Sequence, residues 1–142
     1  MSDPFIDTDV IIRLLTGDDP QKQAEAAALF EQVEAGTLKV AAPDTVIADA
    51  VYVLSSPRLY NVPRPQIEEL LRPLLTLPNF RVRNKRVLVS ALMHYATVNI
   101  DFGDAMIVAS MEQADSKALY SYDTDFDRFP ALSRLTPGTA SA

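Results

Sequence analysis

Apolar residues lie along the chain in short unbroken runs and in longer stretches where they recur every three or four positions. The short runs predict strands at residues 5–6, 38–42, 80–82 and 118–122, with a fifth at 134–136. The helical spacing predicts helices from residue 8 to the stop at Gly17, and over residues 20–35, 44–54, 65–75, 87–98 and 104–113. Strands that alternate with helices in this way predict an α/β sandwich around a mostly parallel sheet.

Capping residues support several of these helix ends. Pro20 suits the first helical position after two aspartates, and Gly36 suits the end of the same helix. Asp44 is expected to cap the next helix. The inward face of the 20–35 helix is expected to carry Ala24, Ala27, Ala28, Phe30 (or Leu29) and Val33.

Two aspartates follow predicted strands. Asp7 ends the first strand and Asp123 ends the fourth. Because ligands of such sheets bind beyond the carboxyl ends of the strands, both aspartates are expected to open onto one crevice.

Length and composition limit the classes of protein that fit. The chain of 142 residues suits one domain, expected over residues 1–136 with a loose tail at 137–142. It has no cysteine and one histidine, which exclude thiol chemistry and a His-rich metal site. The N-terminus carries no export signal, and the longest uncharged run, residues 87–100, is too short to cross a bilayer. We therefore expect a cytoplasmic protein with no membrane partner.

Charge is divided unevenly along the chain. The net charge of −6 argues against a simple electrostatic binder of nucleic acid. Residues 58–86, however, hold seven basic residues against two acidic ones. The acids elsewhere are mostly aspartates, which favour caps, turns and metal sites.

Two further aspartates interrupt apolar helices. Asp49 and Asp104 have no lysine or arginine within four residues, and burying such a carboxylate is costly unless a positive charge compensates it. With Asp7 and Asp123 they make a set of four carboxylates. Oxygen ligands without histidine or cysteine favour Mg²⁺ or Mn²⁺, which can activate water for phosphodiester cleavage.

These residues also carry a resemblance. Residues 5–15 (FIDTDVIIRLL) resemble the opening motif of PIN-domain nucleases, especially VapC-type toxins. Asp104, with the preceding Asp-Phe-Gly, is similar to their third acidic motif, and residues 121–126 (SYDTDF) to their fourth. The resemblance spans about residues 5–136. Two positions depart from the family pattern: Asp49 stands where the family usually has glutamate, and Ser121 where it usually has threonine.

The resemblance implies a PIN-like three-layer α/β/α sandwich with four or five central strands, and a Mg²⁺- or Mn²⁺-dependent endoribonuclease toxin. Such toxins cleave RNA, commonly tRNA or rRNA, are inhibited by a VapB-type antitoxin, and are usually dimers. The catalytic and metal-binding residues would be Asp7, Asp49, Asp104 and Asp123. The residues that would surround and support these four without binding the metal directly are Thr8, Asp101, Ser121 and Asp125. Contacts to RNA would come from Arg13, Arg81, Arg83, Lys85 and Arg86.

Other interpretations stay open. Asp7 can be a helix cap, Asp49 an ordinary surface residue, and Asp104 a favourable charge in the first turn of its helix. Asp101 is expected to be the N-cap of that helix, and His94 a packed or surface residue. Two functional alternatives remain: a degenerate PIN module that binds RNA or protein without cutting, and a haloacid-dehalogenase-like phosphatase with Asp7 as its nucleophile.

Overall fold

The strands pair in two separate parallel sheets in the computed structural model, which describes residues 2–138. The first sheet joins β1 (Val40–Ala42) to β2 (Phe80–Val82), and the second joins β3 (Ala118–Tyr120) to β4 (Ser133–Leu135). Phe5 adds to the first sheet through an isolated parallel bridge to Ala41. The α/β class with parallel strands is thus confirmed, but the strands that were expected in one central sheet are divided between two.

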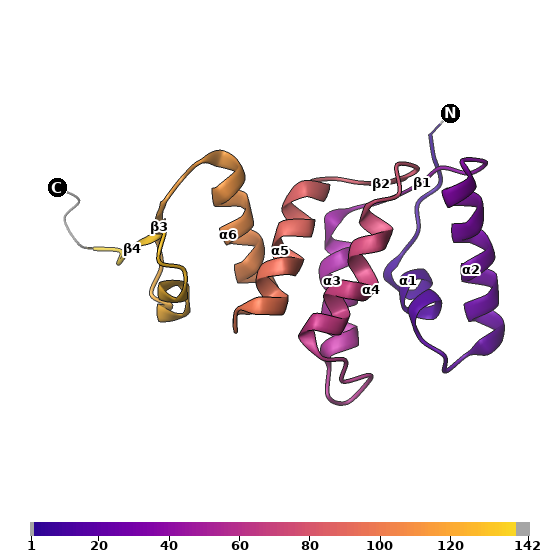
Figure 1. The fold of residues 1–142 in the computed structure, drawn as a ribbon, viewed down its shortest axis with the longest axis horizontal. Coiled ribbons are helices and arrows are strands. Elements are labelled where there is room, and N and C mark those ends of the chain that lie inside the picture. Colours follow the sequence, from indigo (N-terminus) through magenta and orange to yellow (C-terminus); the bar gives the residue numbers. More distant parts are fainter. Residues whose placement is uncertain (1, 139–142) are drawn as a thin grey trace.

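The second sheet is built from two strands that are close in sequence. β3 reaches β4 through residues 121–132, which include the short 3₁₀ helix η1 (Thr124–Arg128), whereas Phe5 lies more than a hundred residues earlier. Figure 1 shows β3 and β4 at one end of the elongated molecule and β1 and β2 near the other.

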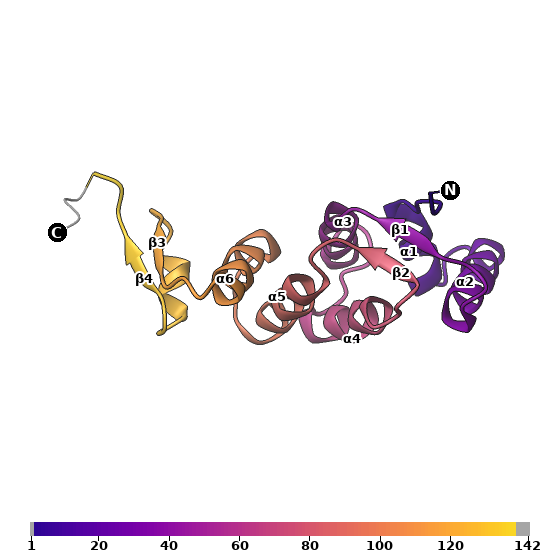
Figure 2. The same ribbon diagram turned by 90° about the horizontal axis from the view of Figure 1, so that it is seen from above.

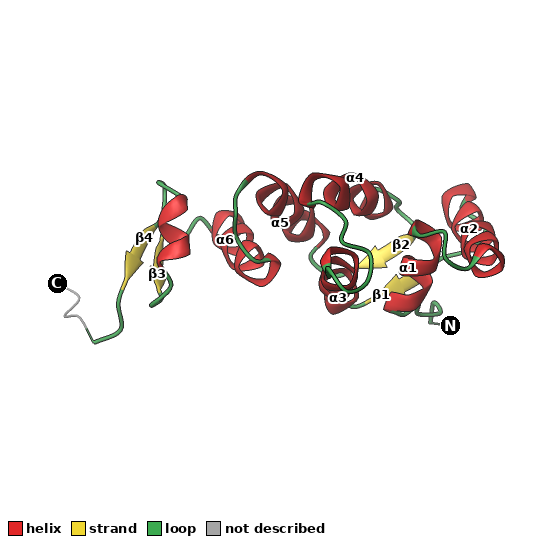
Figure 3. Cartoon of the chain, turned by 90° about the horizontal axis from the view of Figure 1, so that it is seen from below, coloured by secondary structure: helices red, strands yellow, loops and turns green. Residues whose placement is uncertain are grey.

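All six predicted helices form, and their ends lie within two residues of the expected positions. They are α1 (Thr8–Leu15), α2 (Pro20–Ala35), α3 (Asp44–Ser55), α4 (Arg64–Leu75), α5 (Lys85–Thr97) and α6 (Phe102–Ala114). Seen from above and from below, α5 and α6 separate the two sheets (Figures 2 and 3). No helix among residues 2–138 is long and apolar enough to cross a membrane.

The ends of α2 follow its capping residues. The Asp19 carboxylate accepts a hydrogen bond from the Lys22 N–H at 3.1 Å, and Pro20 takes the first turn. Gly36 ends the helix with a φ of 83°, a backbone conformation that residues with a Cβ rarely adopt. Capping at α3 differs from the prediction, because Pro43 holds the N-cap position and Asp44 is the first helical residue.

The inward face of α2 is narrower than predicted. Phe30 and Val33 are buried as expected, but the alanine that joins them is Ala26, and both Ala24 and Ala28 are exposed. Alanine is a weak guide to helix rotation because it buries little surface. The larger Phe30 decides the orientation, packing edge-on against Phe80 with ring centroids 5.6 Å apart.

The core lies on one face of the first sheet. Side chains that alternate along its strands are buried on this face: Ile6, Val40, Ala42, Phe80 and Val82. The opposite face carries Phe5 and Arg81, which are exposed, beside the half-buried Ala41. The single domain at 1–136 remains a prediction, and most of the predicted tail at 137–142 lies outside the described residues.

Candidate active site

Asp7 links the first sheet to α1. The preceding residue, Ile6, donates its N–H to the Ala41 carbonyl at 2.9 Å, so the strand delivers Asp7 to the start of the helix. There Asp7 is the N-cap, and its Oδ1 accepts the Val10 N–H at 3.3 Å. The side chain is exposed, and no bond is recorded for its second oxygen among the described residues. Asp7 therefore caps α1 and keeps one oxygen free to bind another group.

A second group of carboxylates surrounds the start of α6. Asp101 is the N-cap, although its side chain makes no capping hydrogen bond, and Asp104 lies in the first turn. Burial, followed by the negative charges of Asp123, Asp101 and Asp125, raises the pKa of Asp104. We call these four residues the C-terminal acidic cluster. Its like charges repel one another, so the cluster would gain from a bound cation.

Asp123 is held in place by a short chain of hydrogen bonds. Its N–H donates to Ser121 Oγ at 2.9 Å, and its Oδ1 accepts the Asp125 N–H at 2.8 Å to cap η1. Ser121 therefore fixes the backbone that carries Asp123. The serine hydroxyl performs this role without the methyl group that threonine would add.

Two arginines that sequence analysis did not select hold the same turn. Arg134 pairs with Asp127 at 3.0 Å and donates to the Ser121 carbonyl at 3.1 Å. Arg128 pairs with Asp125 at 2.9 Å and reaches the Asn99 carbonyl at 2.6 Å. Both arginines follow closely after the acidic motif at residues 121–126, and this nearness is the signal by which sequence analysis could have selected them. Arg128 draws one cluster carboxylate into an ion pair, which leaves Asp104 and Asp123 as the members best placed to meet a metal.

The expected single crevice is divided. Asp7 and Asp49 are absent from the charges that raise the pKa of Asp104, and α1, which Asp7 caps, lies across the molecule from β3 and β4 (Figures 1 and 2). Asp49 is exposed on α3, so its carboxylate needs no positive charge to offset a cost of burial. The expectation that Asp49 is buried was wrong. Among residues 2–138 no three acidic or histidine side chains come together in a geometry that would hold a metal ion. The cluster thus has the charge for a divalent cation but not a complete set of ligands.

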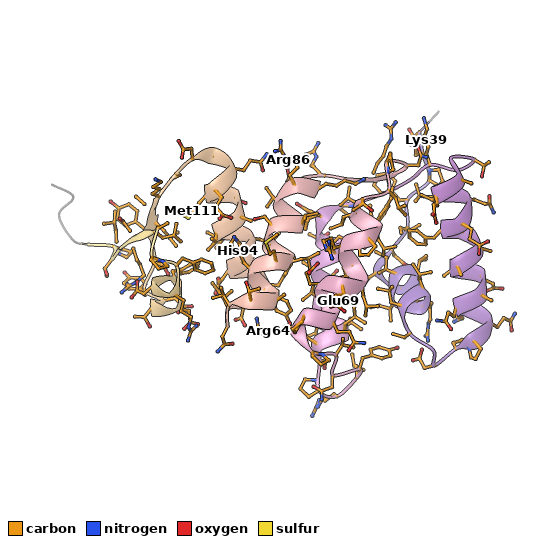
Figure 4. The ribbon with its side chains drawn as sticks, in the orientation of Figure 1. Lys39, Arg64, Glu69, Arg86, His94 and Met111 are labelled. Carbon is orange, nitrogen blue, oxygen red and sulfur yellow. The ribbon has the colours of Figure 1, made fainter. Side chains whose placement is uncertain are left out.

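Most of the predicted RNA-contacting residues gather on one surface. Arg81, Arg83 and Lys85 line a pocket of about 890 Å³ with Phe5 on the uncovered face of the first sheet. Arg86 lies next to them at the start of α5 (Figure 4). Burial lowers the pKa of Lys85, whose ammonium donates to the Leu77 carbonyl at 2.7 Å. We call this set the basic pocket.

The remaining predicted residues have local partners. Arg13 pairs with Asp18 at 3.2 Å and with Asp9 at 3.4 Å, which occupies its guanidinium. Thr8 is the half-buried first residue of α1. His94 contacts Glu112 at 2.6 Å between α5 and α6 and packs edge-on against a phenylalanine, which agrees with a packed histidine.

Comparison with known families identifies the class of protein. A model of the PIN domain matches residues 5–132, nearly the whole chain. The chain therefore belongs to the PIN domain family, whose members are usually nucleases that depend on divalent metals. Among curated proteins the search finds no match.

Proposed function

We propose that this protein is a Mg²⁺- or Mn²⁺-dependent endoribonuclease of the VapC toxin type. The observation that carries the proposal is the raised pKa of Asp104 among acidic neighbours, in a chain of the PIN family. A half-buried carboxylate in this setting gains from a divalent cation and has no cation of its own. Membership of the PIN family also favours a nuclease over the phosphatase alternative.

The cluster supplies carboxylate oxygens, the ligands that Mg²⁺ and Mn²⁺ prefer, although within residues 2–138 too few of them converge to hold the ion alone. Asp104 and Asp123 would ligate the metal, with Asp101 beside them and Ser121 fixing Asp123. A bound divalent ion would lower the pKa of a coordinated water and stabilise the leaving oxygen of the phosphodiester. The chain itself orients Asp123 through Ser121, and the basic pocket would attract the phosphates of RNA. The catalytic and metal-binding roles predicted for Asp7 and Asp49 stay predictions, because neither residue is among the charges that act on Asp104.

The test is cleavage of a purified tRNA and rRNA pool by protein freed of any bound inhibitor. We expect discrete fragments with Mg²⁺ or Mn²⁺ and none with EDTA. Asp104→Asn should lower the rate at least about 100-fold because it removes a charged metal ligand. Asp115→Asn is the matched control: it makes the same substitution at the other end of α6, where a φ of 54° suits asparagine. Equal loss in both variants would contradict the assignment of Asp104.

The Asp7→Asn substitution separates the negative charge of Asp7 from its role as the N-cap of α1. Asparagine caps helices as well as aspartate does, so this variant should keep its stability and lose cleavage. Asp7→Ala should lose cleavage and also about 1 kcal/mol of stability, the usual cost of a missing cap. Full activity of Asp7→Asn would reduce Asp7 to a capping residue.

The toxin and antitoxin parts of the proposal need a cellular test. Induced expression in a bacterial host should arrest growth, and the Asp104→Asn protein should not. Coexpression with a VapB-type antitoxin that binds the protein should restore growth. Equal growth of both strains, with cleavage intact in vitro, would leave a nuclease that is not a toxin. Binding of RNA without cleavage would instead favour the degenerate PIN module.

A further inference from the structure

A second pocket lies beside the acidic cluster, between the end of α3 and the start of α6. Its volume of about 590 Å³ is in the range of pockets that bind small organic groups. Its walls come from four segments: α3, residues 62–64, Tyr95 of α5 and residues 101–103. Arg64, labelled in Figure 4, belongs to this wall. We call it the interhelical pocket.

One wall of the interhelical pocket is an exposed aromatic ring. Tyr52 lines the pocket and exposes 75% of its surface. It lies on the solvent side of α3, whose neighbouring residues Val51 and Leu54 are buried. The ring is therefore not needed to fill the core. Rigid exposed rings of this kind stack planar groups, and every nucleobase offers a face for such stacking.

The charged groups of the interhelical pocket balance. Of the described residues that line it, Arg64 and Asp101 alone are charged. The Arg64 guanidinium is occupied by the carbonyls of Ile100 and Tyr95. The Asp101 side chain makes no capping hydrogen bond, and no ion pair is recorded for it within residues 2–138. A free carboxylate in nearly neutral surroundings suits an uncharged ligand that donates hydrogen bonds, rather than a phosphate.

The hydrogen-bonding capacity of this carboxylate selects among the bases of RNA. An ionised carboxylate only accepts hydrogen bonds, and it does so at two oxygens. Guanine has two adjacent donors on its Watson–Crick edge, N1–H and N2–H, whereas adenine, cytosine and uracil each have one donor group there. Beside these donors guanine carries the acceptor O6. Gly103 lines the pocket in the first turn of α6, where backbone N–H groups have no partner within the helix.

We propose that the interhelical pocket binds a guanine base of the RNA substrate, stacked on Tyr52 and held through N1–H and N2–H by Asp101. Asp101 is also close enough to Asp104 to act on its charge, so the base would lie near the phosphate that the acidic cluster meets. The choice of RNA as the ligand rests on the proposed function. Recognition of the base needs no metal and no cleavage, so it can be measured separately.

Binding in EDTA tests the base preference without cleavage. Fluorescence anisotropy would compare uridine-rich single-stranded oligonucleotides that carry one guanosine, inosine, adenosine or cytidine at the same central position. Inosine lacks only the N2 amino group, so it should bind at least about 10-fold more weakly than guanosine, the usual effect of one hydrogen bond to a charged group. Adenosine and cytidine should bind no better than inosine.

Free GMP, added as a competitor, distinguishes a guanine within RNA from a free nucleotide. GMP should bind at least about 10-fold more weakly than the guanosine oligonucleotide, because it lacks the further phosphates that the basic pocket would attract. Tighter binding of GMP than of the oligonucleotide would overturn the assignment to RNA.

Three substitutions locate the preference in the interhelical pocket. Tyr52→Leu should weaken all four oligonucleotides about 10-fold, because stacking does not depend on the base. Tyr120→Leu is the matched control, the same change at an exposed tyrosine outside the pocket, and should leave binding unchanged. Asp101→Asn replaces one acceptor by a donor, so it should abolish the advantage of guanosine without weakening the other bases. Gly103→Leu should fill the pocket and weaken binding, since an added Cβ there meets nothing within 4 Å.

The outcomes separate this proposal from the proposed nuclease. Equal binding of the guanosine and inosine oligonucleotides, or an unchanged guanosine preference in Asp101→Asn, would overturn the guanine site. A guanosine preference without any cleavage in Mg²⁺ or Mn²⁺ would support the guanine site and contradict the nuclease. Cleavage without a guanosine preference would support the nuclease and overturn the guanine site.

Discussion

At the scale of single residues, Asp104 combines partial burial with acidic neighbours, and both raise its pKa. A carboxylate whose pKa is higher in the folded protein than in the unfolded chain favours folding at acidic pH. That contribution is complete below the unfolded pKa and is lost as the pH rises through the folded pKa. At neutral pH the charged Asp104 therefore lowers stability.

We predict that Asp104→Asn raises the thermal unfolding midpoint at pH 7 in the absence of divalent metal. The increase should shrink as the pH falls and vanish below the ordinary aspartate pKa of about 3.9, where Asp104 is protonated in both states. Differential scanning calorimetry over this pH range measures it. Mn²⁺ should raise the midpoint of the wild type and not of the variant. A midpoint for Asp104→Asn that lies below the wild type at pH 7 would contradict the prediction.

At the scale of elements, Arg64 joins the start of α4 to the end of α5. Its guanidinium donates to the carbonyls of Ile100 at 2.6 Å and Tyr95 at 3.2 Å, and lies 4.2 Å from the centre of the Tyr95 ring. Figure 4 shows Arg64 at this junction. Helices end with unpaired carbonyls, and Arg64 satisfies several of them at once. The turn that it fixes leads directly to Asp101 and the start of α6.

Replacing this guanidinium should cost stability. We predict that Arg64→Lys lowers the free energy of unfolding by about 1–3 kcal/mol, because lysine lacks the planar fork and leaves part-buried carbonyls unpaired. Urea denaturation should show a lower midpoint with an unchanged slope. Arg72→Lys on the same helix is the control: Arg72 makes an exposed pair with Glu68, worth less than about 1 kcal/mol. Equal effects of the two substitutions would remove the special role of Arg64.

At the scale of the whole molecule, core burial is concentrated toward the N-terminal end. Beyond Met111, the sole buried residue in the described part of the chain is Phe126, in η1. The unit made of β3, η1 and β4 therefore adds one buried side chain to the core, beside the partly buried Leu119, Phe129 and Leu132. Phe80, by contrast, is fully buried at the start of β2 in the first sheet.

The two phenylalanines should behave differently when truncated. We predict that Phe80→Ala lowers global stability by about 3–5 kcal/mol, whereas Phe126→Ala mainly opens the C-terminal unit. Hydrogen exchange should then show fast amides in β3 and β4 of Phe126→Ala, with protection in α1 and α3 retained. Loss of protection throughout the Phe126→Ala protein would show that the C-terminal unit does not open separately.

The sequence by itself determined the local features of this protein. The order of helices and strands, the strand at residues 80–82, the ends of α2 and the positions of the acidic motifs all follow from spacing and capping, which act within a few residues. The motifs also pointed to the PIN family, which the family match confirms. Only the tertiary structure decided the rotation of α2, the exposure of Asp49 and which strands pair, because these depend on packing between segments far apart in the chain. For the same physical reason, Asp104 and Asp123 share one acidic cluster while Asp7 lies at the other sheet.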